Sequence, residues 1–161
     1  MKRLLLIRHA KAERYADTDF ERPLSERGIS DCAKVAKVLA SQNFMPDKIL
    51  LSPSKRTMET ADEFIRYLNW PEETIELNRS LYLGSCSTLL QEIRKTGENI
   101  ESLCLIGHND GITELFNSVS DMKIDNMPTC SVGIIVTEEI PWQDWGKVRG
   151  KLRFYSDPKR A

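Results

Sequence analysis

Arg8 and His9 follow a short apolar run, Leu4–Ile7, almost at the start of the chain. Short apolar runs bounded by polar residues are typical of buried strands, often in the middle of a parallel sheet. Because ligands of open α/β sheets bind beyond the carboxyl ends of the strands, we expect Arg8 and His9 at that rim. An imidazole beside a guanidinium at this rim is suited to binding a phosphate or a carboxylate. The alternative is that Arg8 and His9 are ordinary surface residues, which is more common for an isolated Arg-His pair.

Three further motifs favour the anion site over the surface feature. The segment Ser52–Arg56 (SPSKR) follows the apolar residues 49–51, and Gly107–Asn109 (GHN) follows the apolar residues 103–106. The segment Arg22–Gly28 (RPLSERG) opens the first long helical pattern. With only two histidines in the chain, both placed after a central strand, one shared site is the simplest interpretation.

These motifs, in this order, resemble those of the histidine phosphatase superfamily, which includes the cofactor-dependent phosphoglycerate mutases and the acid phosphatases. The likeness is strongest to its short members, the phosphohistidine phosphatases of the SixA type. The motifs span residues 8 to 109, and length and element order agree over nearly the whole chain. One departure is Ala10, which stands where most of the superfamily has glycine after Arg-His.

The resemblance implies roles for four residues. His9 would be the nucleophile that attacks phosphorus and becomes a phosphohistidine intermediate, so it must be neutral, with its other ring nitrogen held by a backbone carbonyl. Arg8, Arg56 and His108 would surround the phosphoryl oxygens and offset their charge without a metal or other cofactor. A zinc site is disfavoured, because two histidines lack a clustered third ligand, and no G-x-S-x-G motif marks a serine nucleophile.

Four more residues are candidates for substrate binding. Arg22 belongs to the Arg-Pro-Leu motif, and Lys11 lies in the same loop, where solvated charges are an equally good explanation of both. Ser52 is expected to cap a helix whose first residue is Pro53. Asn109 is expected to contribute its backbone N–H.

A carboxylate general acid is missing from its usual place. Superfamily members that act on phosphate esters carry it after the second motif helix, where Ser80 stands here, and no acid occurs between Leu77 and Gln91. Only acids of the loop 12–24 remain, and they serve only if that loop folds over the site: Glu13, Asp17 and Asp19. An alkoxide leaving group needs a proton, whereas an imidazole with a pKa of about 6.5 leaves easily.

The missing acid favours a phosphatase for phosphohistidine, carried by a protein partner or present in a small phosphorylated substrate. Two alternatives stay open. One is a phosphatase for small phosphate esters whose acid comes from the first loop. The other is a non-catalytic module that binds phosphorylated ligands.

Composition sets the broad class. The chain has 161 residues, 40% of them hydrophobic and 29% charged, which fits a single domain over residues 1–161. The net charge of −1 provides no basic field for nucleic acid or membrane. The four cysteines have no metal-binding spacing, and the first apolar run is too short for a signal peptide. We expect a cytoplasmic monomer.

Strand and helix patterns alternate along the chain. They predict a three-layer α/β/α sandwich with a mostly parallel sheet and an antiparallel edge, which agrees with the phosphoglycerate mutase-like fold that the resemblance implies. Strands are expected at residues 4–7, 48–51, 75–77, 103–106, 131–137 and 148–155, and helices after Ser25, after Ser52, over residues 87–95 and after Asn109.

Overall fold

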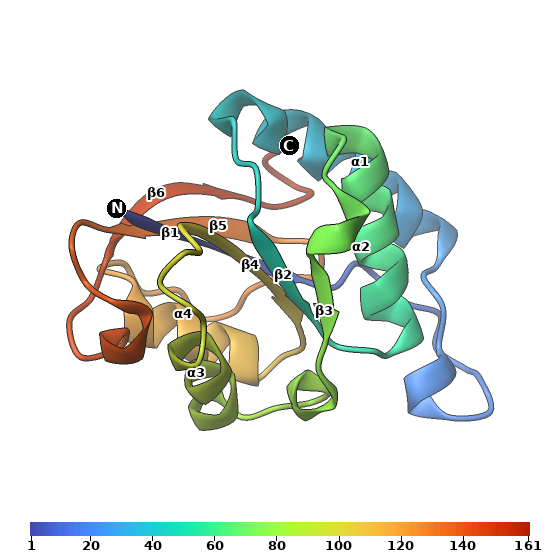
Figure 1. Ribbon diagram of the computed structural model, residues 1–161. Coiled ribbons are helices and arrows are strands. Elements are labelled where there is room, and N and C mark those ends of the chain that lie inside the picture. The colour runs from blue at the N-terminus through green and yellow to red at the C-terminus, as the bar shows by residue number, and fades with distance from the viewer.

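One six-stranded sheet, in the order β3-β2-β4-β1-β5-β6, forms the middle layer of the protein (Figure 1). The computed structural model describes residues 1–161. Its strands are β1 Lys2–Arg8, β2 Lys48–Leu51, β3 Ile75–Leu77, β4 Ser102–Gly107, β5 Val132–Thr137 and β6 Lys151–Ser156. Its α-helices are α1 Glu26–Leu39, α2 Lys55–Leu68, α3 Cys86–Arg94 and α4 Gly111–Val119. Single 3-10 turns occur at Asp19–Glu21, Ala40–Gln42, Glu72–Thr74, Arg79–Leu81 and Trp142–Asp144.

The alternation of side chains along β1 separates two cores. Leu5 and Ile7 pack with the apolar faces of α1 and α2, and Leu4 and Leu6 pack with those of α3 and α4. Helices therefore cover both faces of the sheet, as Figure 1 shows, and the four apolar residues of β1 are fully buried. This confirms the predicted three-layer sandwich.

Strand directions also follow the prediction. β1, β2, β3 and β4 run parallel to one another, and β5 runs antiparallel to both β1 and β6, which makes an antiparallel edge. No helix is both long and apolar enough to cross a membrane.

The two helices that precede the site begin in different ways. Ser25 caps α1 as expected, because its side chain accepts a hydrogen bond from Gly28 N at 3.1 Å. The prediction that Ser52 caps the next helix is wrong. α2 begins at Lys55 with Ser54 as its N-cap residue, and the Ser52 side chain instead contacts His108. Because serine is a favoured N-cap residue on either side of Pro53, capping preference alone could not show whether Ser52 or Ser54 precedes the helix.

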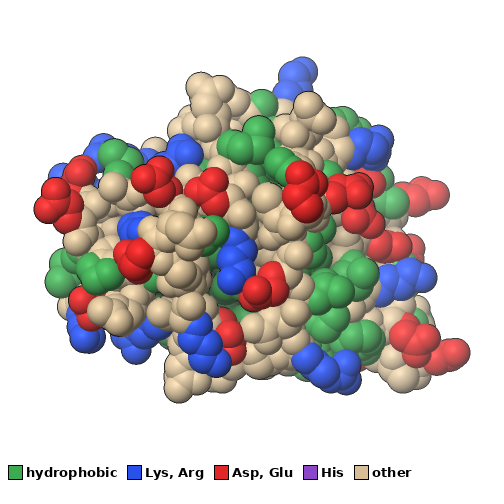
Figure 2. All heavy atoms as spheres, in the orientation of Figure 1, with side chains coloured by type: hydrophobic (Ala, Val, Ile, Leu, Met, Phe, Trp, Pro, Cys, Tyr) green, Lys and Arg blue, Asp and Glu red, His purple; other side chains and the backbone are tan.

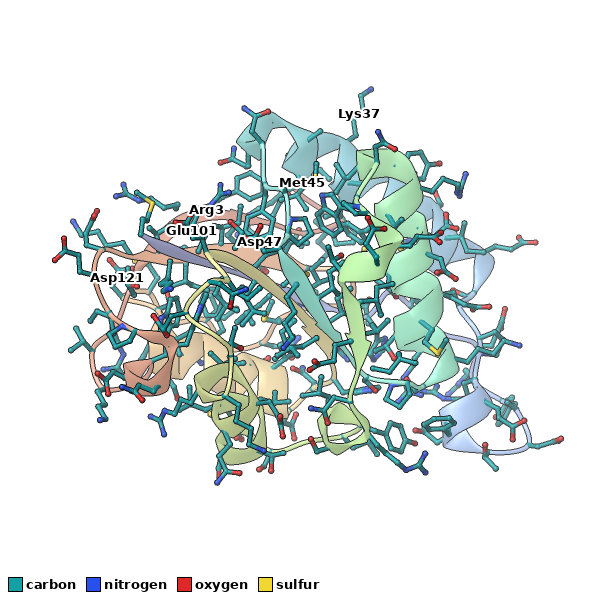
Figure 3. The ribbon with its side chains drawn as sticks, viewed as in Figure 1. Arg3, Lys37, Met45, Asp47, Glu101 and Asp121 are labelled. Carbon is teal, nitrogen blue, oxygen red and sulfur yellow. The ribbon has the colours of Figure 1, made fainter.

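Polar contacts join the amino ends of β2 and β4, at the end of the sheet opposite to Arg8. The Asp47 carboxylate accepts hydrogen bonds from the backbone N–H groups of Glu101 and Ser102, both at 3.0 Å. Figure 3 shows Arg3, Asp47 and Glu101 grouped at that end. Trp142 and Trp145, which lie between β5 and β6, are buried and stacked with ring centroids 4.9 Å apart.

Gly28 fixes the start of α1 against the segment that follows His9. An added Cβ there would lie 2.1 Å from the Lys11 carbonyl oxygen, which also accepts the Ser25 N–H. Alanine normally stabilises a helix relative to glycine. Here we expect Gly28→Ala to lower the free energy of unfolding by about 1–3 kcal/mol, because backbone must move. Urea titration measures this.

Gly97→Ala provides the control, because a Cβ there meets only the Asn99 side chain. Equal stability of Gly28→Ala and the unmodified protein would show that this backbone contact is not a constraint.

Candidate active site

The carboxyl ends of β1, β2 and β4 meet at one edge of the sheet. Arg8 pairs with Gly107 in register, and Leu51 pairs with Ile106, so the residues that follow these strands are neighbours. His9 comes after β1, Ser52 after β2 and His108 after β4. The sequence predicted this meeting from the strand ends alone.

His9 is held in a defined tautomer. Its Nδ1 lies 2.7 Å from the Ala10 carbonyl oxygen, which can only accept, so Nδ1 carries the proton and Nε2 keeps its lone pair. The side chain is buried, and burial lowers its pKa from 6.5 to about 4, with further lowering by Arg56 and Arg8. His9 is therefore a neutral imidazole at neutral pH, with one nitrogen available as a nucleophile.

His108 lies beside His9, with ring centroids 5.3 Å apart. Its Nε2 is 2.8 Å from Ser52 Oγ, and its Nδ1 is 3.3 Å from an Arg56 Nη. Because the guanidinium can only donate, Nδ1 accepts and Nε2 carries the proton toward Ser52. Burial, together with His9 and Arg56, lowers the pKa of His108 to about 3, so this imidazole is also neutral.

Arg8 and Arg56 are the cations of the site. One Nη of Arg8 donates to the Met127 carbonyl oxygen at 2.8 Å. Arg56 is almost fully buried, at 2% exposure, near the amino end of α2. The Nε atoms of both arginines are buried and have no hydrogen-bond partner in the protein. Unsatisfied buried donors are costly, so the site holds both arginines with part of their hydrogen-bonding capacity unused.

Thr60 links the nucleophile segment to α2. Its hydroxyl accepts from the Ala10 N–H at 3.0 Å and donates to the Arg56 carbonyl oxygen at 2.7 Å. The residue after His9 is thus fixed, by two hydrogen bonds, to the main chain of the helix residue Arg56. Sequence patterns alone gave Thr60 no role in the site.

The first loop does reach the site, through Asp19. Its carbonyl oxygen accepts from Arg56 Nη1 at 2.8 Å, and its carboxylate accepts from Arg56 Nη2 at 3.0 Å. The Tyr82 hydroxyl donates to the same carboxylate, and the Tyr82 ring lies edge-on to His108 with centroids 5.4 Å apart. Sequence reasoning named Asp19 only as one of three possible acids and missed Tyr82, since neither lies in a motif.

Of the remaining candidates, Arg22 is joined to the central residues through Asp19, whereas Asn109 and Lys11 make other contacts. Arg22 is brought in through Asp19, whose carboxylate it contacts at 3.1 Å, and its charge contributes to the lowered pKa of His9. Asn109 has its side chain bonded to Asn126 and Thr113. Lys11 is exposed and lines a different hollow with Arg27, Asp31 and Lys159. Ser80 is exposed and donates to Asn78 and Glu92 rather than to any of the four central residues.

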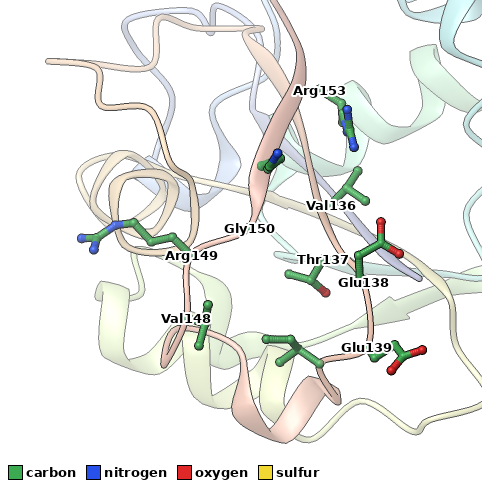
Figure 4. Close-up of a pocket in the computed structure, with 10 residues that line it drawn as sticks. Val136, Thr137, Glu138, Glu139, Val148, Arg149, Gly150 and Arg153 are labelled. Atoms are coloured by element: carbon green, nitrogen blue, oxygen red, sulfur yellow. The ribbon is translucent and has the colours of Figure 1, made fainter.

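The rest of the surface offers weaker candidates. Charges of both signs are interspersed on the face in Figure 2, without a single-sign field. A hollow of about 320 Å³ lies between Val136–Ile140 and Val148–Arg153 (Figure 4), but Thr137 pairs with Lys2, at the opposite end of β1 from Arg8. No group of three or more His, Cys, Asp or Glu side chains has an arrangement suited to a metal ion.

Comparison with known proteins places this chain in a family. The model of the histidine phosphatase superfamily (branch 1) matches residues 4–103, and the chain belongs to that superfamily. An uncharacterised chloroplastic protein of Arabidopsis thaliana is 29% identical over 153 residues, 89% of this chain and 70% of its own length. Phosphohistidine phosphatase SixA of Escherichia coli is 31% identical over 108 residues, 65% of this chain and 66% of its own length.

Solved structures agree on the fold. The structure of the protein histidine phosphatase SixA complexed with tungstate has a TM-score of 0.82 and 22% identity, and the match covers 98% of this chain and 97% of that one. The fold is thus that of the phosphoglycerate mutase-like histidine phosphatases.

The lowered pKa values of His9 and His108 predict a particular pH dependence of stability. In the unfolded chain each imidazole takes up a proton near pH 6.5, whereas in the folded protein they do so only near pH 4 and pH 3. Stability is therefore complete above pH 6.5 and falls as the pH is lowered toward 4, by up to about 1.4 kcal/mol per pH unit for each histidine.

Urea unfolding of the natural chain and of the double variant His9→Gln/His108→Gln, at pH 7 and pH 5, isolates this contribution. Carboxylate protonation affects both chains equally, so the double variant should lose less stability between the two pH values. Equal losses would contradict the neutral, buried state of the two imidazoles.

Proposed function

We propose that this protein is a phosphatase that hydrolyses phosphohistidine, carried by a phosphorylated protein, through a covalent intermediate on His9 and without a metal. The observation that carries the proposal is the neutral imidazole of His9, which keeps one unprotonated nitrogen and whose pKa is lowered by burial and by the nearby charges of Arg56 and Arg8. Two fixed cations supply the charge stabilisation that phosphoryl transfer requires. The resemblance to SixA supports the substrate class.

The tautomer of His9 supports both halves of the reaction. Nε2 attacks phosphorus while the substrate P–N bond breaks, and the electron pair of that bond goes to the leaving nitrogen. Because the Nδ1 proton is held by the Ala10 carbonyl oxygen, the phosphorylated His9 ring carries a positive charge. Water then attacks phosphorus, and His9 leaves as a neutral imidazole, which is a good leaving group.

Asp19 supports the choice of phosphohistidine over alkyl esters. It is the first-loop acid that contacts the central residues, which makes it the candidate for a general acid. However, the hydrogen bond from Tyr82 and the contact with Arg56 hold its pKa below the ordinary value. An ionised carboxylate is a poor proton donor at neutral pH. Substrates whose leaving group needs no proton are therefore favoured, and a leaving imidazole meets this condition when its distal nitrogen is protonated.

The phosphoenzyme tests the proposed nucleophile and metal independence. A labelled phosphohistidine peptide, incubated with the protein in the presence of a chelator and quenched at alkaline pH, should place label on His9. His9→Ala should yield no label and no turnover while retaining the circular dichroism spectrum of the natural chain. Label on His108 or on a serine would refute the assignment, as would activity that chelator removes and a divalent ion restores.

Leaving-group dependence tests the substrate class. Phosphohistidine and aryl phosphates should be hydrolysed at least about 10²-fold faster than phosphoserine or a sugar phosphate, which is the usual contribution of a general acid. Initial rates on matched peptides measure this ratio. Turnover of the alkyl esters that rivals phosphohistidine would instead favour a small-ester phosphatase, and binding without hydrolysis of any substrate would favour a phospho-ligand module.

A further inference from the structure

Asp19 contacts both terminal nitrogens of Arg56. Its main-chain oxygen accepts from Nη1 at 2.8 Å and its carboxylate from Nη2 at 3.0 Å. Nη2 also donates to His108 Nδ1 at 3.3 Å, and the buried Nε–H has no hydrogen-bond partner in the protein. A planar guanidinium held at two nitrogens cannot turn about its Nε–Cζ bond, so its orientation is fixed.

Asp19 is itself held from two further sides. The Tyr82 hydroxyl donates to Oδ2, the oxygen that also accepts from Arg56, and Arg22 contacts Oδ1 at 3.1 Å. The ring of Tyr82 is fixed in turn by edge contacts with Phe20, at 5.0 Å between centroids, and with His108. Arg79 lies over Phe20 at 5.2 Å. Two segments far apart in sequence, residues 19–22 and 79–82, thus join at the Asp19 carboxylate.

The carboxylate has an electrostatic cost for anion binding. Arg56 is buried and Asp19 half exposed, at 3% and 48% of the side-chain surface, so their charges partly cancel at the edge of the site. A negative charge beside the arginine weakens binding of a phosphate in the ground state. If Asp19 aids the reaction although it weakens ground-state binding, its benefit must come from another effect. Its contacts with Arg56 supply one, because they hold the guanidinium in a fixed orientation.

We propose that Asp19, secured by Tyr82, is a positioning residue that orients the Arg56 guanidinium toward the phosphoryl group in the transition state. This inference rests on the proposed phosphatase reaction, but not on phosphohistidine as the substrate. It assigns to the 12–24 loop a catalytic effect that acts through one side chain.

The main variant is Asp19→Ala, with Asp17→Ala as the matched control. Asp17 is an exposed acid of the same loop and makes no hydrogen bond or ion pair. With an aryl phosphate as substrate, Asp19→Ala should lower kcat by about 10- to 100-fold, the scale of a small misplacement of a catalytic group. Inorganic phosphate should inhibit it as tightly as the natural protein or more tightly. Asp17→Ala should leave both quantities unchanged.

Three further measurements separate positioning from a structural role. In an Arg56→Lys background, which lacks the fork, Asp19→Ala should change kcat by less than about twofold. Tyr82→Phe, which removes only the hydroxyl, should cause a smaller loss of kcat than Asp19→Ala. Arginine side-chain NMR, which needs no turnover, should detect faster rotation of the Arg56 guanidinium in Asp19→Ala but not in Asp17→Ala.

Three results would overturn the inference: an undiminished kcat in Asp19→Ala, a full additional loss in the Arg56→Lys background, or phosphate binding that weakens in parallel with kcat. Failure of the proposed substrate is distinguishable from these results. A protein that hydrolyses the aryl phosphate but not phosphohistidine refutes the substrate class and leaves the positioning experiment intact.

Discussion

Two guanidinium groups lie beside two imidazoles at one edge of the sheet, and the structure depends on keeping those imidazoles neutral. Like charges in a buried place repel strongly. Burial and the nearby arginines lower the pKa of His9 and of His108 to about 4 and about 3, so the site carries positive charge only on its arginines. In the proposed reaction, the positive charge that attracts a phosphoryl group and the imidazole lone pair that attacks it therefore arise from the same arrangement.

The sheet makes this arrangement possible because its central strands are parallel. β1, β2 and β4 all end at one edge, and the pairing of Arg8 with Gly107 brings the segments after β1 and β4 together. Two buried cores, one against α1 and α2 and one against α3 and α4, fix the sheet from both faces. Side chains mounted on strand ends and a helix start lose little freedom when substrate binds, which favours preorganised catalysis.

The first loop changes the character of the site. A carboxylate brought to the phosphate pocket is expected to act as a proton donor in an ester phosphatase, but here Tyr82 and Arg56 lower the pKa of Asp19. The same contacts that prevent proton donation hold the arginine fork. In the proposed reaction the loop therefore contributes geometry rather than a proton, which is consistent with a leaving group that departs as a neutral imidazole.

The sequence by itself determined the fold class and four central residues, because short apolar runs that end in Arg-His, Ser-Pro and Gly-His-Asn carry both strand position and chemistry. It misplaced the cap of α2, where Ser54 rather than Ser52 precedes the helix, and so did not foresee the contact of Ser52 with His108. Only the tertiary structure brought Asp19 and Tyr82 together, because they are 63 residues apart. Local patterns encode which residues end a strand or begin a helix, whereas contacts between two loops depend on how the whole chain packs, and no local periodicity records them.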